Sequence, residues 1–121
     1  MERRAYPRVE VSHPVLYLSD VYPRPKVAST LDLSLGGTKI ESLYSLTRDE
    51  GLEITIAIHP QAIKCRGQVM RVLWLKNGKM EAGIQFEGLP EHDRLYLRQY
   101  LFHVMEQQAM ESIPSPEKTP L

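Results

Sequence analysis

Short runs of alternating apolar and polar residues follow one another from residue 9 to residue 86, with turn residues between them. In the clearest run, 52–58, Leu and Ile occupy every second position, so their side chains should point to one buried face. Alternation at this spacing is typical of an all-β domain with half-buried strands. The pattern predicts six strands, over residues 9–18, 28–33, 37–42, 52–58, 63–75 and 80–86.

The sequence also predicts how the last two strands connect and which element comes after them. The pair Asn77-Gly78 is favoured in two-residue hairpins, because both positions of such a turn have positive φ. Pro90 suits the first position of a helix, and apolar residues from Leu97 and Leu101 onward recur at helical spacing. We therefore expect a hairpin and then a C-terminal helix that packs on the strands.

The two ends of the chain differ from the part between them. Residues 111–121 contain three prolines and little apolar mass, so they cannot recover the entropy lost on ordering and are expected to form a disordered tail. Residues 1–8 are expected to form a flexible arm rich in arginine. Residues 9–110 should form one domain, because six short strands usually close into a small barrel or sandwich.

Charge and cysteine content narrow the classes of function. Fifteen Lys and Arg against fifteen Asp and Glu give a formal net charge of zero, so no overall field draws the protein to a nucleic acid polymer or a membrane. Cys65 is the single cysteine, and the first residues lead into no apolar signal region. No apolar stretch approaches the ~20 residues of a spanning helix. We expect a cytoplasmic protein without membrane insertion.

The residues that usually carry catalysis form no recognisable set. The four histidines are never paired at metal-ligand spacing, and no serine or cysteine stands in a nucleophile elbow. Cys65 is most simply a packed strand residue, and Trp74 is expected to pack in the core or on the barrel surface. We therefore expect no enzyme, no metal and no cofactor.

Three arginines, Arg3, Arg4 and Arg8, lie within six residues just before the first predicted strand. Pro7 disfavours the α conformation in the residue before it, so this segment should be extended. Arg4 and Arg8 would then share one side, with Cα atoms roughly 13 Å apart. A guanidinium fork fits phosphate oxygens and also the O6 and N7 acceptors of guanine. Taken alone, the cluster is equally well interpreted as a solvated basic chain end.

A second cluster, residues 32–37, lies between two predicted strands. Alternation should send the leucines inward and Asp32 and Ser34 outward. A carboxylate can accept from the N1 and N2 donors of guanine, and a serine adds a hydroxyl. Gly36 and Gly37 permit positive φ and close approach of a ligand to the backbone. Taken alone, this cluster is also an ordinary turn in which Asp and Ser bond their own backbone.

Together the two clusters resemble the paired signature of the PilZ domain family. R-x-x-x-R matches Arg4 and Arg8, and [DN]-x-S-x-x-G matches Asp32, Ser34 and Gly37. The last strand and the closing helix also look like the family, so the resemblance covers residues 3 to about 105. It implies a six-stranded antiparallel β-barrel with a C-terminal α-helix, which binds cyclic di-GMP (c-di-GMP) on its outer surface.

The resemblance also implies roles for single residues. Those matching Arg4 and Arg8 contact phosphates and guanine in the family, while those matching Asp32, Ser34 and Gly37 hold a guanine. Gly36 is included because, like Gly37, it lets a ligand approach the backbone closely, and Arg3 resembles members that bind an intercalated pair of ligands. Losing one such arginine should weaken binding about tenfold or more.

The function implied by the resemblance is that of a bacterial c-di-GMP receptor. The arm would become ordered on binding and change the surface offered to an unidentified downstream protein. The receptor is expected to be a monomer or a weak dimer. The alternative is a protein-interaction adaptor of bacterial motility or pilus machinery that acts without the nucleotide.

Overall fold

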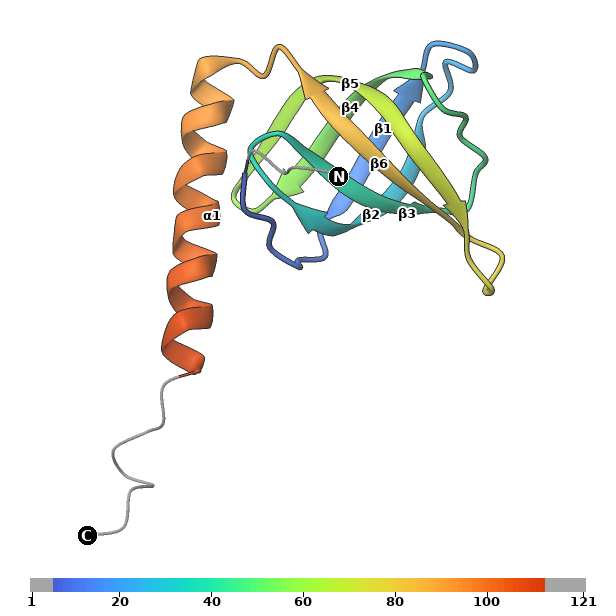
Figure 1. The fold of residues 1–121 in the computed structure, drawn as a ribbon. Coiled ribbons are helices and arrows are strands. Elements are labelled where there is room, and N and C mark those ends of the chain that lie inside the picture. The colour runs from blue at the N-terminus through green and yellow to red at the C-terminus, as the bar shows by residue number, and fades with distance from the viewer. Residues whose placement is uncertain (1–5, 113–121) are drawn as a thin grey trace, which may run out of the picture.

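The computed structural model describes residues 6–112, in which six strands close into one antiparallel barrel and one helix lies beside it (Figure 1). The elements are β1 (Pro14–Ser19), β2 (Lys26–Leu33), β3 (Gly37–Ser42), β4 (Gly51–Ile58), β5 (Gln61–Trp74), β6 (Met80–Glu87) and α1 (Glu91–Glu111). The expected fold class is thereby confirmed. Arg3, Arg4 and most of the expected arm and tail lie outside the described residues.

The strands follow the order β1-β2-β3-β6-β5-β4 around the barrel, which β1 and β4 close. The side chains of Leu52, Ile54, Ile56 and Ile58 are at most 1% exposed, so the alternation in β4 does mark the buried face. Burying each such side chain stabilises the fold by roughly 1.5–3 kcal/mol. One polar pair joins this core, because the Tyr17 hydroxyl lies 2.8 Å from the Ser42 hydroxyl.

The first strand is shorter than predicted and begins at Pro14 rather than at residue 9. Val9 forms only an isolated bridge with Leu33. Between these points the hydroxyl of Thr30 replaces the ladder, since it accepts from the His13 backbone N–H at 2.9 Å and donates to the Val11 carbonyl at 2.5 Å. A side chain bonded in this way competes with regular strand pairing.

The β5–β6 hairpin is present, but its turn is not the two-residue turn that the sequence predicts. Of its residues only Gly78 has positive φ, at 82°. The Gly78 N–H donates to the Leu75 carbonyl at 3.2 Å, and the Leu75 N–H donates to the Lys79 carbonyl at 2.8 Å. This is a three-residue loop in which a left-handed residue follows a tight turn. In Figure 1 the hairpin projects beyond the barrel.

The helix starts one residue later than predicted, with Pro90 as its N-cap and Glu91 as its first residue. Leu97 and Leu101 are buried against the barrel, whereas Gln108 is exposed. Figure 1 shows the reason: the helix runs past the barrel, so its last turns, from Glu106 onward, are exposed. Within residues 6–112 no helix is long and apolar enough to cross a membrane.

Candidate functional site

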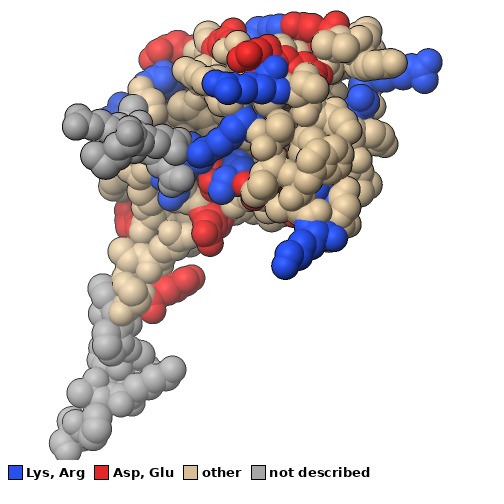
Figure 2. Space-filling model, turned by 45° about the vertical axis from the view of Figure 1, so that its right-hand side comes forward, with Lys and Arg blue, Asp and Glu red and all other residues tan. Residues whose placement is uncertain are grey.

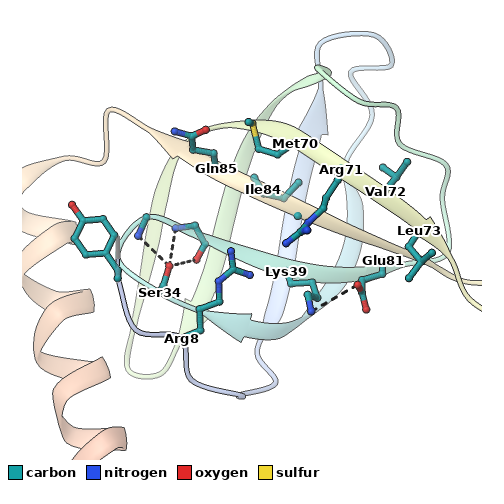
Figure 3. A pocket seen from close by; sticks show the side chains of 14 residues that line it. Arg8, Ser34, Lys39, Met70, Arg71, Val72, Leu73, Glu81, Ile84 and Gln85 are labelled. Atoms are coloured by element: carbon teal, nitrogen blue, oxygen red, sulfur yellow. Dashed lines mark hydrogen bonds and ion pairs between the residues drawn. The ribbon is translucent and has the colours of Figure 1, made fainter. Parts of the chain in front are cut away.

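An open groove of about 730 Å³ lies on the outer wall of the barrel, where β3, β6 and β5 meet the β2–β3 turn (Figure 3). Its lining contains three basic side chains, from Arg8, Lys39 and Arg71, and one acidic side chain, from Glu81. Figure 2 shows basic side chains gathered around a hollow on one face of the molecule. Although the net charge of the chain is zero, this groove is locally basic and suits an anion.

Asp32 does not itself line the groove but contacts two residues that do, and it is held by three groups. Its Oδ1 accepts from the Lys39 backbone N–H at 3.0 Å, while its Oδ2 lies 3.3 Å from Arg8 Nη1 and 3.8 Å from Lys39 Nζ. Asp32 faces outward from the barrel as predicted, since its neighbour Leu33 is fully buried. It is nevertheless only 7% exposed, because the basic side chains cover it. The outward orientation that alternation predicts therefore does not make the carboxylate accessible to solvent.

A register shift between Thr30 and Asp32 also changes the alternation in β2. Leu31 sits in this bulge and is half-buried instead of entering the core. Bulges of this kind re-aim the side chains around them. The shift lets Thr30 and Leu33 both face inward while Asp32 turns toward Lys39 on β3.

Ser34 organises the turn between β2 and β3. Its hydroxyl accepts from the backbone N–H groups of Gly36 and Gly37, each at 3.2 Å, and can donate to the Gly37 carbonyl at 3.2 Å. The side chain is 5% exposed and not solvent-facing, so the outward orientation that alternation predicts does not make it accessible. The Gly36 carbonyl then accepts from the Phe86 N–H at 2.9 Å, which ties the turn to β6.

The two glycines are required for close approach within the protein rather than for positive φ. A Cβ on Gly37 would lie 2.1 Å from the carbonyl oxygen of Ile84, and a Cβ on Gly36 would lie 2.9 Å from the Tyr6 ring. Neither glycine has positive φ, which among the described residues occurs elsewhere. The positive φ that glycine permits is therefore not used at either position, and the physical reason for glycine is steric.

Arg8 reaches Asp32 because the chain before β1 crosses β2. Val9 and Leu33 exchange backbone hydrogen bonds at 3.0 and 2.9 Å, which sets the preceding residue beside the carboxylate. Tyr6, two residues earlier, lies against Gly36 and accepts a hydrogen bond from Arg94 of α1 at 3.4 Å. The structure thus brings Arg8 together with the second cluster.

The groove also contains residues that sequence reasoning did not select as site residues. Lys39 pairs with Asp32 in the β2–β3 ladder, and Arg71 lies opposite Gly83 in the β5–β6 ladder. A Cβ on Gly83 would lie 3.5 Å from the Arg71 side chain, so the arginine stem lies over this glycine. Alternation in β3 could have indicated that Lys39 faces outward, but only the barrel closure shows that β5 faces the same groove.

The described residues offer binding groups more clearly than reactive ones. Burial raises the pKa of the Cys65 thiol to about 11, which keeps it protonated and unreactive near neutral pH. Burial likewise lowers the pKa of His13, whose ring nitrogen lies 2.6 Å from the Tyr100 hydroxyl. Within residues 6–112 no three His, Cys, Asp or Glu side chains gather as metal ligands would. The basic side chains of the groove can bind the charged part of an anionic ligand. The Asp32 carboxylate beside them can accept hydrogen bonds from the donors of the same ligand.

Comparison with solved structures places this barrel among known ones. It superposes on Bacillus subtilis inhibitor of motility (MotI/DgrA) with a TM-score of 0.76 at 18% identity, covering 88% of this chain and 53% of that one. It superposes on YcgR in complex with c-di-GMP from Escherichia coli with a TM-score of 0.77 at 14% identity, covering 92% of this chain and 50% of that one. It superposes on the K. pneumonia MrkH–c-di-GMP complex with a TM-score of 0.76 at 15% identity, covering 93% of this chain and 56% of that one. The chain thus shares their fold and spans about half the length of each.

No curated protein matches the chain significantly. The family model described as "PilZ domain" matches residues 2–103, which include both clusters and extend into α1. The fold, the groove and this match agree over the same part of the chain. The protein therefore belongs to the PilZ domain family.

Proposed function

We propose that this protein is a receptor for c-di-GMP that catalyses no reaction and signals to a downstream protein. The observation that carries the proposal is the contact between the Asp32 carboxylate and Arg8, which lines the groove together with Lys39 and Arg71. This places cations for phosphates beside an acceptor for the N1 and N2 donors of guanine. The solved complexes of YcgR and MrkH with c-di-GMP, which share the fold, support the same ligand.

The contacts suggest a division of labour within the groove. Asp32 uses Oδ1 for the Lys39 backbone, while its Oδ2 interacts with two long basic side chains that can change rotamer. A carboxylate has about four lone-pair sites, so a guanine edge can bind there when Arg8 turns to a phosphate or to the base. Ser34 and Gly37 shape the turn that holds Asp32 in place, and Gly36 lies beside the ligand.

The first part of the arm completes this proposal. Arg3 and Arg4 are proposed to close over the nucleotide, and Arg3 to favour an intercalated pair of ligands. Arg8 Nη1 lies 3.3 Å from Asp32 Oδ2, and binding is proposed to exchange this ion pair for contacts with the ligand. The arm is proposed to become ordered in that exchange, which changes the surface beside α1 where Tyr6 and Arg94 meet.

Isothermal titration of the full chain with c-di-GMP tests the receptor assignment. We expect Arg8→Ala and Asp32→Asn each to weaken binding about tenfold or more, because each removes a charge-assisted contact. Arg66→Ala is the matched control, since Arg66 is an exposed arginine that pairs with Asp20 and lies outside the groove. No binding by the wild-type chain, or equal losses in all three variants, would contradict the assignment.

Specificity and arm ordering have separate tests. Cyclic di-AMP should bind at least about tenfold more weakly, because adenine lacks the N2 donor and the O6 acceptor that Asp32 and an arginine would read.

Amide hydrogen exchange should slow in residues 2–8 when the nucleotide binds. Equal exchange with and without nucleotide would remove the ordering step. The alternative, an adaptor that acts without the nucleotide, predicts a partner whose capture is indifferent to c-di-GMP and to Arg8→Ala.

A further inference from the structure

The end of β5 has one edge to which no described strand is paired. β4 pairs with β5 only as far as Gln68, and Val69 then exchanges backbone hydrogen bonds with Asp49 and Glu50. Beyond that point β5 continues along β6 alone, from Arg71 to Trp74, as the projecting hairpin of Figure 1 shows. An unpaired edge of this kind is a template for another extended chain.

The hairpin turn shows which backbone groups point to this edge. Leu75 directs both its N–H and its carbonyl toward the β6 side, to Lys79 and Gly78. In an antiparallel ladder the bonded residues alternate, so Leu73 also faces β6 while Val72 and Trp74 face the open edge. Among residues 6–112, none of the backbone hydrogen bonds outside the regular strands and helix reaches either residue. Two donors and two acceptors are thus available.

The side chains at this edge are apolar and unusually exposed. The exposed fractions are 36% for Val72, 57% for Leu73 and 60% for Trp74. Trp74 therefore does not lie in the core, which was one of the two positions expected for it, but on the surface at the end of β5. An exposed apolar edge strand is a liability in a monomer, and proteins usually cover such edges or place charges on them.

We propose that this edge is the contact surface of a two-fold dimer, in which β5 of one copy pairs antiparallel with β5 of a second. The sequence is self-complementary in the register centred on Leu73. Val72 and Trp74 then form two equivalent bonded pairs, Leu73 faces its own copy, and Arg71 faces Leu75. No like charges oppose each other, and pairs of aromatic with β-branched side chains stabilise antiparallel strands.

The geometry of the barrel limits this assembly to two copies. A two-fold contact uses this same edge of both copies, so the contact closes on itself and leaves neither edge free for a third copy. The short edge makes a small interface, which fits a weak dimer. Because Arg71 and Leu73 also line the groove, the dimer brings the two grooves to the same face of the joined sheet, on either side of Leu73. Figure 3 shows these two side chains along one wall of the groove.

Sedimentation equilibrium of the full chain without nucleotide tests the dimer, from micromolar to near-millimolar concentration. We expect a reversible monomer–dimer equilibrium that Trp74→Lys weakens at least about tenfold, because it loses both aromatic pairs. Leu16→Lys is the control: Leu16 is 44% exposed, but it is paired on both sides, with Val27 of β2 and Thr55 of β4. A wild-type chain that stays monomeric, or equal weakening by both variants, overturns the proposal.

A covalent trap tests the register independently. Directly opposed, non-bonded residues in antiparallel strands have Cα atoms about 4.5 Å apart, which a disulfide can span. Leu73→Cys should therefore form a disulfide-linked dimer on mild oxidation, whereas Leu16→Cys should not. No cross-linking, or equal cross-linking of both variants, would overturn the two-fold register. Neither experiment uses c-di-GMP, so its failure leaves the receptor proposal to its own titration.

Discussion

The two walls of the groove are built on opposite principles. The wall formed by the β2–β3 turn is buried and internally bonded: Asp32 and Ser34 are 7% and 5% exposed, and their side chains bind backbone N–H groups. The wall formed by the end of β5 exposes Leu73 and Trp74 and leaves a strand edge unpaired. The first wall is preorganised, which suits recognition of a small ligand. The second wall exposes apolar side chains and unpaired backbone groups, which suits contact with another chain.

The largest expected loss of stability is at a glycine that has no room for a side chain, compared with one that only needs a positive φ. Gly37→Ala should reduce the free energy of unfolding by about 3 kcal/mol, because the new Cβ meets the Ile84 carbonyl oxygen at 2.1 Å and the backbone must move. Gly78→Ala should cost about 1 kcal/mol, because it has open space and only a positive φ to strain. Urea denaturation of both variants measures the difference. Equal losses would mean that the buried turn is not tightly fitted.

Removal of the Ser34 hydroxyl tests the internal bonding of the same wall. Ser34→Ala should destabilise the protein by about 2 kcal/mol, because two backbone N–H groups lose their acceptor in a buried turn. Urea denaturation measures this, and Ser34→Thr, which keeps a hydroxyl, is the matched comparison. If the alanine variant is as stable as the wild type, the turn does not depend on this side chain.

The paired part of β5 can be compared with its free end through Cys65. Burial raises the thiol pKa to about 11 from about 9, so the folded state holds this proton more tightly than the unfolded state. The resulting stability is complete below about pH 9 and is lost as pH rises toward 11, with about 2 kcal/mol lost by pH 10.5. Denaturation midpoints at pH 8 and pH 10.5 measure this. Cys65→Ala should show a smaller decline, and an equal decline would refute the assignment to Cys65.

The smallest effect is expected at the exposed wall. Leu73→Ser should change the stability of the monomer by less than about 0.5 kcal/mol, because Leu73 is 57% exposed and its backbone bonds to β6 remain. Denaturation at low protein concentration, where the proposed dimer dissociates, provides the measurement. A loss of about 2 kcal/mol would show that this wall is part of the core and would remove the contrast between the two walls.

Much of the barrel was predictable from local patterns. The alternation in β4 identifies its buried face, and the glycine of the β5–β6 hairpin places that turn. The start of β1 was not predictable, because the Thr30 hydroxyl that interrupts it comes from another strand. The burial of Asp32 was not predictable for a similar reason, since its covering side chains include Arg8, far away in sequence.

By itself the sequence determined which residues alternate, where the helix lies and which two clusters carry guanine- and phosphate-binding groups. Such features depend on neighbours within a few positions, and local periodicity encodes them. Only the tertiary structure decided that Lys39 and Arg71 share a groove with Arg8. It also decided that the Ile84 carbonyl leaves room for no side chain at position 37, and that β5 extends beyond its pairing with β4. These depend on the order and register in which distant strands meet, and barrel closure fixes that order.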